Sequence, residues 1–243
     1  MSMSGSFLEG PNVTYAQRLK KVGIFEGLTE AQLLRIEEIA VEQNVAKCDY
    51  LFRQGDNPDW LYILLRGKVK LVRQAPTGAA TIIEIYSVGD ELTAGAVLEG
   101  RPYPASARML TDGVAMRISQ HDFRRLLCES PVVCSNIMRE LGSRYRELME
   151  NLSSLAVYNV EGRLCKVMAN LARRFGILGD CRGTILDLAL TRQDLADIAG
   201  TTLETTIRIL NRLRDNGLIQ WEGKRFFIPD VRALDGTQQQ FAC

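Results

Sequence analysis

The sequence predicts an α+β fold in three consecutive parts: an N-terminal antiparallel β-roll of the jelly-roll (double-stranded β-helix) type, a long coiled-coil dimerisation helix and a C-terminal winged helix-turn-helix. Three observations predict this order. Short β-rich runs between glycines occupy the first half, an apolar heptad stripe follows, and two capped helices around a glycine precede a hairpin. The 243 residues, 46% hydrophobic and 24% charged, suit two modest folded domains.

The first half of the chain alternates β-rich runs with glycine turns at the spacing of a small barrel or sandwich. The runs are Leu61–Leu65, Lys68–Arg73, Thr81–Tyr86 and Val114–Ile118, and the dividing glycines are Gly55, Gly67, Gly78, Gly89 and Gly113. We expect a hairpin across Gly78. Apolar residues recur at helical spacing over Glu30–Glu42, so we also expect a helix that packs outside the roll.

A different period begins at Pro131 and continues to Tyr158. Apolar residues there recur at alternating steps of four and three, which is the pattern of a coiled-coil seam. The stripe consists of Cys134, Met138, Leu141, Tyr145, Leu148, Leu152 and Leu155. It predicts a parallel homodimer with a seam from Met138 to Leu155. The alternative is a helix that lies on its own barrel, but three heptads are longer than a small barrel can cover.

The C-terminal part begins at Asn159, whose short side chain can cap a helix over Val160–Phe175. A loop over Gly176–Gly183 and a strand over Thr184–Ala189 are expected to follow.

The segment from Leu190 to Arg214 indicates a helix, a tight turn and a second helix. Thr191 caps the first helix with Asp194 three residues later, an acidic variant of the capping box, and Gly200 supplies the turn. Thr202 caps the second helix. Its expected inward residues are Ile207, Leu210 and Leu213.

The second helix leaves Leu203, Glu204 and Arg208 facing outward. Glu204 and Arg208 stand four residues apart on one side, and they suit a DNA major groove, where a carboxylate accepts from cytosine N4 and a guanidinium donates to guanine. A surface salt bridge is the alternative interpretation of this pair, but the helix-turn-helix context favours base reading. Leu203 suits a thymine methyl group.

Phosphate contacts are expected beside this helix. After Gly217, the runs Leu218–Trp221 and Phe226–Ile228 indicate a hairpin with a basic tip, which makes the domain a winged helix. Hydroxyls, side-chain donors and basic groups at helix starts and on the wing can contact phosphate oxygens. The expected DNA-backbone residues are Arg192, Gln193, Thr202, Thr205, Arg212, Lys224 and Arg225.

Several other classes lack support in the sequence. The longest apolar runs fall far short of the roughly 20 residues of a membrane helix, and Met1–Gly10 lacks the regions of a signal peptide. We therefore expect a cytoplasmic protein without a membrane partner. The sequence has one histidine, His121, and its cysteines are scattered, so it contains none of the usual zinc-ligand patterns. We therefore expect no metal site. No catalytic triad or phosphate-gripping glycine loop can be assembled, so we expect no enzyme.

From about Phe25 to Leu234 the layout resembles the Crp/Fnr family of bacterial regulators. The resemblance rests on the glycine-divided roll, the stretches VGDEL at 88–92 and LEGRP at 98–102, the dimer helix, and the Thr191–Arg214 motif followed by NGLI. It implies a homodimeric, sequence-specific transcription regulator that binds palindromic double-stranded DNA, contacts RNA polymerase and responds to an effector in the roll. Leu203, where the cyclic-AMP branch has an arginine, favours a TTGA-like half-site.

The resemblance also bears on the effector. Where the cyclic-AMP branch carries a Gly-Glu pair for ribose and an Arg-Ser pair for phosphate, this chain has Thr93-Ala94 and Tyr103-Pro104, which argues against cyclic AMP. The residues expected around the effector are Leu92, Thr93, Ala94, Arg101, Tyr103, Pro104, Leu148 and Met149.

The resemblance to the other branches of the family bears on two cofactors, an iron–sulfur cluster and haem. No cysteine precedes Cys48, which argues against the iron–sulfur cluster of the oxygen-sensing branch. The stretch Arg101–Ser106 looks closer to the Dnr-like branch, which implies haem or nitric oxide as an alternative effector, with His121 as the candidate haem ligand. The alternative interpretation of His121 is a cap or surface residue at a strand–helix junction. Cysteine redox chemistry is a further alternative: the six cysteines are interpreted as free thiols, and Cys128 and Cys134 are the nearest pair.

These expectations divide the chain into a flexible leader over 1–20, an effector-sensing roll over 21–130, a dimerisation helix over 131–158 and a DNA-binding domain over 159–243. The competing hypothesis is a ligand- or partner-binding sensor module whose winged helix mediates protein contacts.

Overall fold

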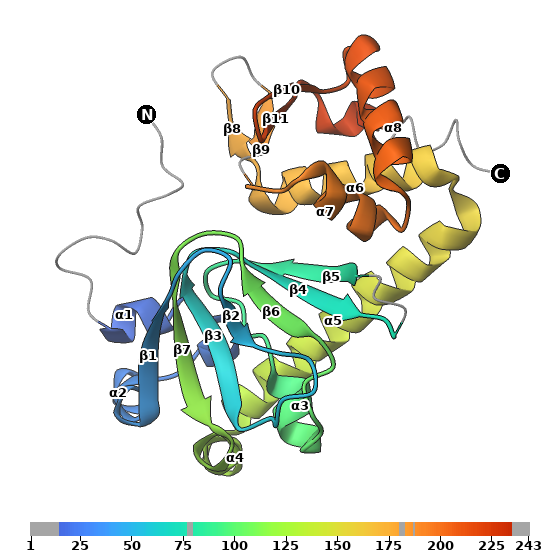
Figure 1. The fold of residues 1–243 in the computed structure, drawn as a ribbon. Coiled ribbons are helices and arrows are strands. Elements are labelled where there is room, and N and C mark those ends of the chain that lie inside the picture. Colours follow the sequence, from blue (N-terminus) through green and yellow to red (C-terminus); the bar gives the residue numbers. More distant parts are fainter. Residues whose placement is uncertain (1–14, 77–79, 180–182, 187, 235–243) are drawn as a thin grey trace. The chain divides into compact units, whose positions relative to one another are not determined.

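The computed structural model describes residues 15–76, 80–179, 183–186 and 188–234, with the backbone alone described at 15, 16, 150, 151 and 153–157. The chain divides into two compact units, Met1–Arg146 and Glu147–Cys243 (Figure 1). No helix among the described residues is long and apolar enough to cross a membrane.

The first unit contains two antiparallel sheets. In the three-stranded sheet, β1 (Ala40–Val45) and β3 (Trp60–Arg66) flank β7 (Gly113–Ser119). In the four-stranded sheet, the order is β2 (Tyr50–Phe52), β6 (Ser106–Met109), β4 (Val69–Gln74) and β5 (Ala80–Tyr86). This arrangement confirms the antiparallel roll and the pairing of the strands on either side of Gly78, a residue that lies outside the described part.

The apolar run of β3 supplies two cores at once because successive side chains of a strand point to opposite faces. Tyr62 and Leu64 pack with residues of both sheets in the roll interior. Leu61, Ile63 and Leu65 pack against helices on the other face of the three-stranded sheet. Those helices are α1 (Tyr15–Leu19), η1 (Gly23–Phe25), α2 (Glu30–Ile39), α3 (Ala94–Glu99), α4 (Gln120–Glu129) and the start of α5 (Pro131–Val157).

The expected helix over Glu30–Glu42 is wrong at its C-terminal end. It ends at Ile39, because the next residues form β1 and pair with β7 from Ala40 opposite Ile118 onward. Strands β2 and β6 and the short helix α3 (Ala94–Glu99) were not expected either. Helix α1 lies inside the segment expected to be a leader, and its Leu19 is fully buried.

The N-terminal turns of α5 belong to the first unit's core. Val133 and Ile137 are buried there, and Asn136 Nδ2 donates hydrogen bonds to the carbonyl oxygens of Ile24 (3.2 Å) and Glu26 (2.8 Å). The helix therefore packs on its own roll at one end. Its heptad residues lie on a different face, on which Met138 is 68% and Tyr145 62% exposed.

In the second unit the end of α5 is followed by α6 (Val160–Phe175), capped by Asn159, whose side chain accepts from the Gly162 amide as expected. The helix-turn-helix consists of α7 (Arg192–Ala199) and α8 (Leu203–Asp215). A four-stranded sheet runs in the order β10 (Gln220–Glu222), β11 (Arg225–Ile228), β9 (Thr184–Leu186) and β8 (Ile177–Leu178). Two expectations were wrong in detail: β8 lies inside the expected loop, and β9 ends at Leu186.

Candidate nucleic-acid interface and ligand cavity

Local signals build the helix-turn-helix of the second unit. Thr191 and Asp194 form a reciprocal capping box at the start of α7, and Gly200 ends that helix in the left-handed conformation at φ 63°. The hydroxyl of Thr202 accepts from the Thr205 amide and caps α8. Each of these residues has the local role that the sequence predicts.

The inward face of α8 differs from the expectation at one position. Leu210 and Leu213 are buried as expected, but Ile207 is 42% exposed, and the buried face is completed by Thr206 and Ile209. The reason is helical phase: Thr206, Ile209, Leu210 and Leu213 follow the three- and four-residue steps of a single face.

The outward face of α8 presents charged and apolar residues together. Glu204 and Arg208 are exposed, and neither has an ion-pair partner among the described residues. Leu203 is 39% exposed and Ile207, four residues later, 42%. A carboxylate, a guanidinium and two aliphatic side chains are thus available on one surface, which suits contact with base edges and thymine methyl groups.

The expected DNA-backbone residues lie in three different settings. Lys224 is exposed in the turn between β10 and β11. The Arg192 guanidinium stacks over the rings of Trp221 (5.4 Å) and Phe226 (5.9 Å), so the start of α7 contacts the wing. Arg212 forms an ion pair with Glu161.

The remaining expected backbone residues have local partners or exposed positions. Thr202 and Thr205 share a hydroxyl–hydroxyl hydrogen bond of 2.9 Å. Gln193 donates to Asp197 at 2.7 Å. Arg225 is exposed on β11.

Helix α6 fixes both helices of the motif, and the sequence did not indicate this. Arg163 donates to the carbonyl oxygens of Ala199 (3.2 Å) and Gly200 (3.4 Å), where α7 ends. Glu161, 5% exposed, accepts from Arg212 of α8 in a two-atom contact. These contacts hold the turn and the outward helix relative to the N-terminus of α6.

The roll contains a cavity of about 170 Å³. Five of the residues expected around an effector line this cavity: Leu92, Thr93, Ala94, Tyr103 and Pro104. Arg101 is not part of the described lining, and its exposed side chain lies 4.0 Å from Glu99. Leu148 and Met149 belong to the second unit, where they are 52% and 38% exposed.

The cavity also contains an ion pair that sequence reasoning missed. Glu91 is 2% exposed, and its carboxylate accepts from the amides of Thr93 (3.1 Å) and Ala94 (2.8 Å). It lies 3.2 Å from the guanidinium of Arg144, a residue of α5. Arg144 also donates to the Tyr86 hydroxyl (3.0 Å) and to Glu140 (2.7 Å). No local signal could reveal a pair whose members lie 53 residues apart.

Burial and charge act in opposite directions on this pair. Burial raises the pKa of the Glu91 carboxyl above its ordinary value, and the positive charge of Arg144 offsets only part of that increase. For Arg144, burial favours the neutral form, but the charges of Glu91, Tyr86 and Glu140 raise the pKa of the guanidinium above its ordinary value. Burial also raises the pKa of the Tyr86 hydroxyl well above its ordinary value.

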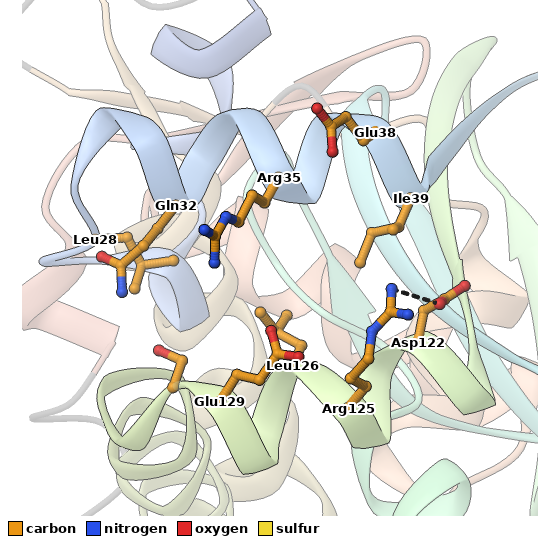
Figure 2. A pocket seen from close by; sticks show the side chains of 10 residues that line it. Leu28, Gln32, Arg35, Glu38, Ile39, Asp122, Arg125, Leu126 and Glu129 are labelled. Atoms are coloured by element: carbon orange, nitrogen blue, oxygen red, sulfur yellow. Dashed lines mark ion pairs between the residues drawn. The ribbon is translucent and has the colours of Figure 1, made fainter.

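A second cavity, of about 260 Å³, lies between α2 and α4 (Figure 2). Figure 2 shows Gln32 and Arg35 of α2 facing Glu129 of α4, and Arg125 paired with Asp122 at 3.1 Å. It contains none of the residues expected around an effector. His121 is exposed on α4 and is not part of the described lining of either cavity.

Comparisons with known proteins agree with this architecture. Residues 42–130 match the family model of the cyclic nucleotide-binding domain, and residues 162–236 match that of the Crp-like helix-turn-helix domain. A CRP-like cAMP-activated global transcriptional regulator from Mycobacterium tuberculosis is 28% identical over 218 residues, covering 89% of this chain and 96% of the relative. An anaerobic regulatory protein from Pasteurella multocida is 28% identical over 208 residues, covering 85% and 76%.

Solved structures share the fold. The c-di-GMP responsive global regulator CLP from Xanthomonas campestris has a TM-score of 0.74 at 20% identity, covering 83% of this chain and all of that chain (100%). FixK2 from Bradyrhizobium japonicum has a TM-score of 0.73 at 18% identity, covering 82% and 96%.

The fold, the outward face of α8 and the matched families define a DNA-binding transcription regulator with an effector-binding domain. The chain belongs to the Crp/Fnr family. The Mycobacterium tuberculosis relative is a transcriptional regulator, and the Pasteurella multocida relative is a regulatory protein.

Proposed function

We propose that this protein is a homodimeric, sequence-specific regulator that reads a palindromic site of TTGA-like half-sites through α8 and is controlled by an effector in the roll. One observation carries the proposal: α8 exposes Glu204 and Arg208 without ion-pair partners among the described residues, beside the exposed aliphatic residues Leu203 and Ile207. Glu204 and Arg208 read the shared core of the half-site, and Leu203 contacts a thymine methyl group. Bound at a promoter, such a regulator contacts RNA polymerase in the cytoplasm.

The exposed stripe of α5 supports the homodimer. Met138, Tyr145, Leu148 and Leu152 are each more than half exposed, and Leu141 is 38% exposed. Apolar residues repeated over three heptads are costly in water, and pairing with a second copy of the same helix buries them. The side chain of Leu155, the last residue of the proposed seam, lies outside the described side chains.

The domain boundaries of this proposal are a leader over 1–20, a sensing roll over 21–130, a dimerisation helix over 131–158 and a DNA-binding domain over 159–243. Backbone contacts position the reading helix. Lys224 and Arg225 contact phosphates from the wing, and the start of α7 contributes Arg192 and Gln193. Thr202, Thr205 and Arg212 contact phosphates from α8.

The lining of the roll cavity argues against cyclic AMP as the effector. Thr93, Ala94, Tyr103 and Pro104 stand where the cyclic-AMP branch binds ribose and phosphate, and the only guanidinium in the described lining, that of Arg144, is paired with Glu91. A cyclic phosphate therefore lacks a free charged partner there. Haem with His121 as ligand, nitric oxide, and redox chemistry of Cys128 and Cys134 are the alternative controls.

Fluorescence anisotropy with duplex DNA tests the proposal. The duplex carries TTGA and its inverted repeat TCAA, with half-site centres about one helical turn apart. We expect preference over a scrambled duplex to persist as salt is raised, while affinity falls as counterions are released. Equal weak binding to both duplexes contradicts the proposal and favours a winged helix that mediates protein contacts.

Variants of α8 and of the wing distinguish residues that recognise bases from residues that contact the DNA backbone. Arg208→Ala should remove about 1–3 kcal/mol of discrimination at one base pair, because it deletes a bidentate donor. The control Lys224→Ala should weaken binding to all sequences alike, because it deletes only a phosphate contact. Unchanged specificity in Arg208→Ala contradicts the proposed docking.

A further inference from the structure

We propose that the roll cavity binds a small, uncharged and mainly apolar molecule about the size of one aromatic ring. This inference rests on the proposed control by an effector in the roll, for which it names the ligand class.

The first argument is size. The cavity measures about 170 Å³. A cavity of about 150 Å³ accommodates benzene, whereas pockets for drug-sized ligands measure about 300–1,000 Å³. A single ring therefore fits the space, and a nucleotide does not.

The second argument is the character of the lining. Most residues are aliphatic, aromatic or small and present carbon atoms to the cavity. They are Phe52, Leu71, Leu92, Ala94, Gly95, Ala96, Pro104, Ala105 and Leu141. Such a surface gains free energy when an apolar molecule replaces water, because apolar area is removed from water on both partners.

The third argument is that the polar side chains of the described lining already have partners. The Thr93 hydroxyl accepts from the Tyr62 amide (3.0 Å) and donates to the Trp60 carbonyl oxygen (3.1 Å). The Tyr103 hydroxyl donates to the same carbonyl oxygen at 2.7 Å. No side chain of this group needs a hydrogen bond from a ligand.

The fourth argument is charge. Glu91 and Arg144, the two charged residues of the described lining, form an ion pair at 3.2 Å. An anionic ligand must compete with Glu91 for the guanidinium, and Glu140 places another carboxylate 2.7 Å from it. A cationic ligand must compete with Arg144 for Glu91. An uncharged ligand leaves the pair intact and avoids the cost of burying an unpaired charge.

Three probes of nearly equal size and different charge test the ligand class: toluene, benzoate and benzylamine. Binding to the full-length protein is measured at pH 7 by isothermal titration calorimetry, with cyclic AMP as a fourth ligand. We expect toluene to bind and each charged probe to bind at least about a hundredfold more weakly, because its charge has no free partner. Benzoate, benzylamine or cyclic AMP binding as tightly as toluene overturns the inference, and so does the absence of toluene binding.

A cavity-filling variant locates the site. Ala96 is half-buried on α3 and lines the cavity, so Ala96→Leu should reduce toluene affinity at least about tenfold by occupying the space. The matched control is Ala31→Leu on the exposed face of α2, which should bind toluene like the wild type. Equal toluene affinity in both variants places the ligand elsewhere and overturns the inference. If Ala96→Leu does not fold, the comparison of the four ligands on the wild type still decides.

The same preparation distinguishes the failure of this inference from the failure of the proposed function. DNA anisotropy is recorded with and without toluene. Half-site discrimination without toluene binding keeps the proposed DNA reading and overturns the ligand class. Toluene binding that leaves DNA affinity unchanged keeps the cavity assignment and contradicts effector control through this ligand class.

Discussion

The ion pair between Glu161 of α6 and Arg212 of α8 should contribute unequally through its two members. The Glu161 side chain is 6% exposed, whereas the Arg212 side chain is 56% exposed. Arg212→Gln leaves a carboxylate in a buried position without its cation. In Glu161→Gln the Arg212 guanidinium can rotate into solvent, and the glutamine keeps a hydrogen-bonding side chain in the buried position.

The structure sets the expected magnitudes. Removing one partner of a fully buried pair costs about 3–5 kcal/mol. Water reaches the Arg212 side of this pair, so we expect Arg212→Gln to lower the free energy of unfolding of the second unit by about 2 kcal/mol. Exposed ion pairs contribute about 0–1 kcal/mol, so Glu161→Gln should cost no more than about 1 kcal/mol.

Trp221 provides the assay. The chain contains two tryptophans, Trp60 in the first unit and Trp221 in the second. In a Trp60→Phe background, urea unfolding followed by tryptophan fluorescence therefore reports on the second unit. Arg208→Gln is the control, because it removes an exposed guanidinium from the same helix and should change stability by less than about 0.5 kcal/mol. A larger loss in Glu161→Gln than in Arg212→Gln refutes the reasoning.

Three more predictions follow from buried groups. Thr206 Oγ1 is buried without a hydrogen-bond partner among the described residues, so Thr206→Val should stabilise the second unit by about 1 kcal/mol in the Trp221 assay. A loss of stability in this variant contradicts the prediction. Thr205→Val, which removes a hydrogen-bonded hydroxyl, is the control. The pKa of Glu91 is raised above its ordinary 4.5, so native protein binds more protons than unfolded protein between 4.5 and the raised value. Stability of the wild type minus that of Glu91→Gln, measured by urea unfolding across pH, should therefore be greatest below about pH 4.5. It should fall by up to about 1.4 kcal/mol per pH unit above that, and a rise refutes the assignment. Burial, and to a smaller extent the nearby Glu161 charge, raises the pKa of the Cys165 thiol to about 12. Iodoacetamide at pH 8 should therefore alkylate the exposed Cys48 and Cys128 before Cys165. Peptide mass spectrometry measures the labelling, and equal labelling of Cys165 contradicts the prediction.

Much of the second unit was predictable because its signals are local. Asn159, Thr191 and Thr202 each lie next to the helix that they cap, and the helix expected after Asn159, over Val160–Phe175, has the bounds of α6. Ile207 was placed inward because Thr206 occupies the buried position of its turn, and a threonine does not mark a core face in a sequence. Packing, which determines the phase of α8, is visible only in the folded chain.

The first unit was harder to predict because its boundaries depend on long-range pairing. The helical period of α2 continues past Ile39, but Ala40–Val45 gains strand hydrogen bonds with a segment about 70 residues away. The resemblance predicted five of the residues that line the cavity, Leu92, Thr93, Ala94, Tyr103 and Pro104. It did not predict Glu91 and Arg144, because each resembles an ordinary surface charge until the fold brings them together.

Leu141 connects the two proposals that concern the first unit. It lines the roll cavity, and it is also 38% exposed on the stripe that we assign to the dimer seam. Arg144, three residues later on the same helix, is held by Glu91 and Tyr86. A molecule in the cavity therefore touches the proposed seam directly, and no relay through the sheets is needed. Coupling energies between sites are typically about 1–3 kcal/mol. We expect a change of that size in the packing of Leu141 to make the proposed dimer assembly, and with it DNA affinity, depend on the proposed effector.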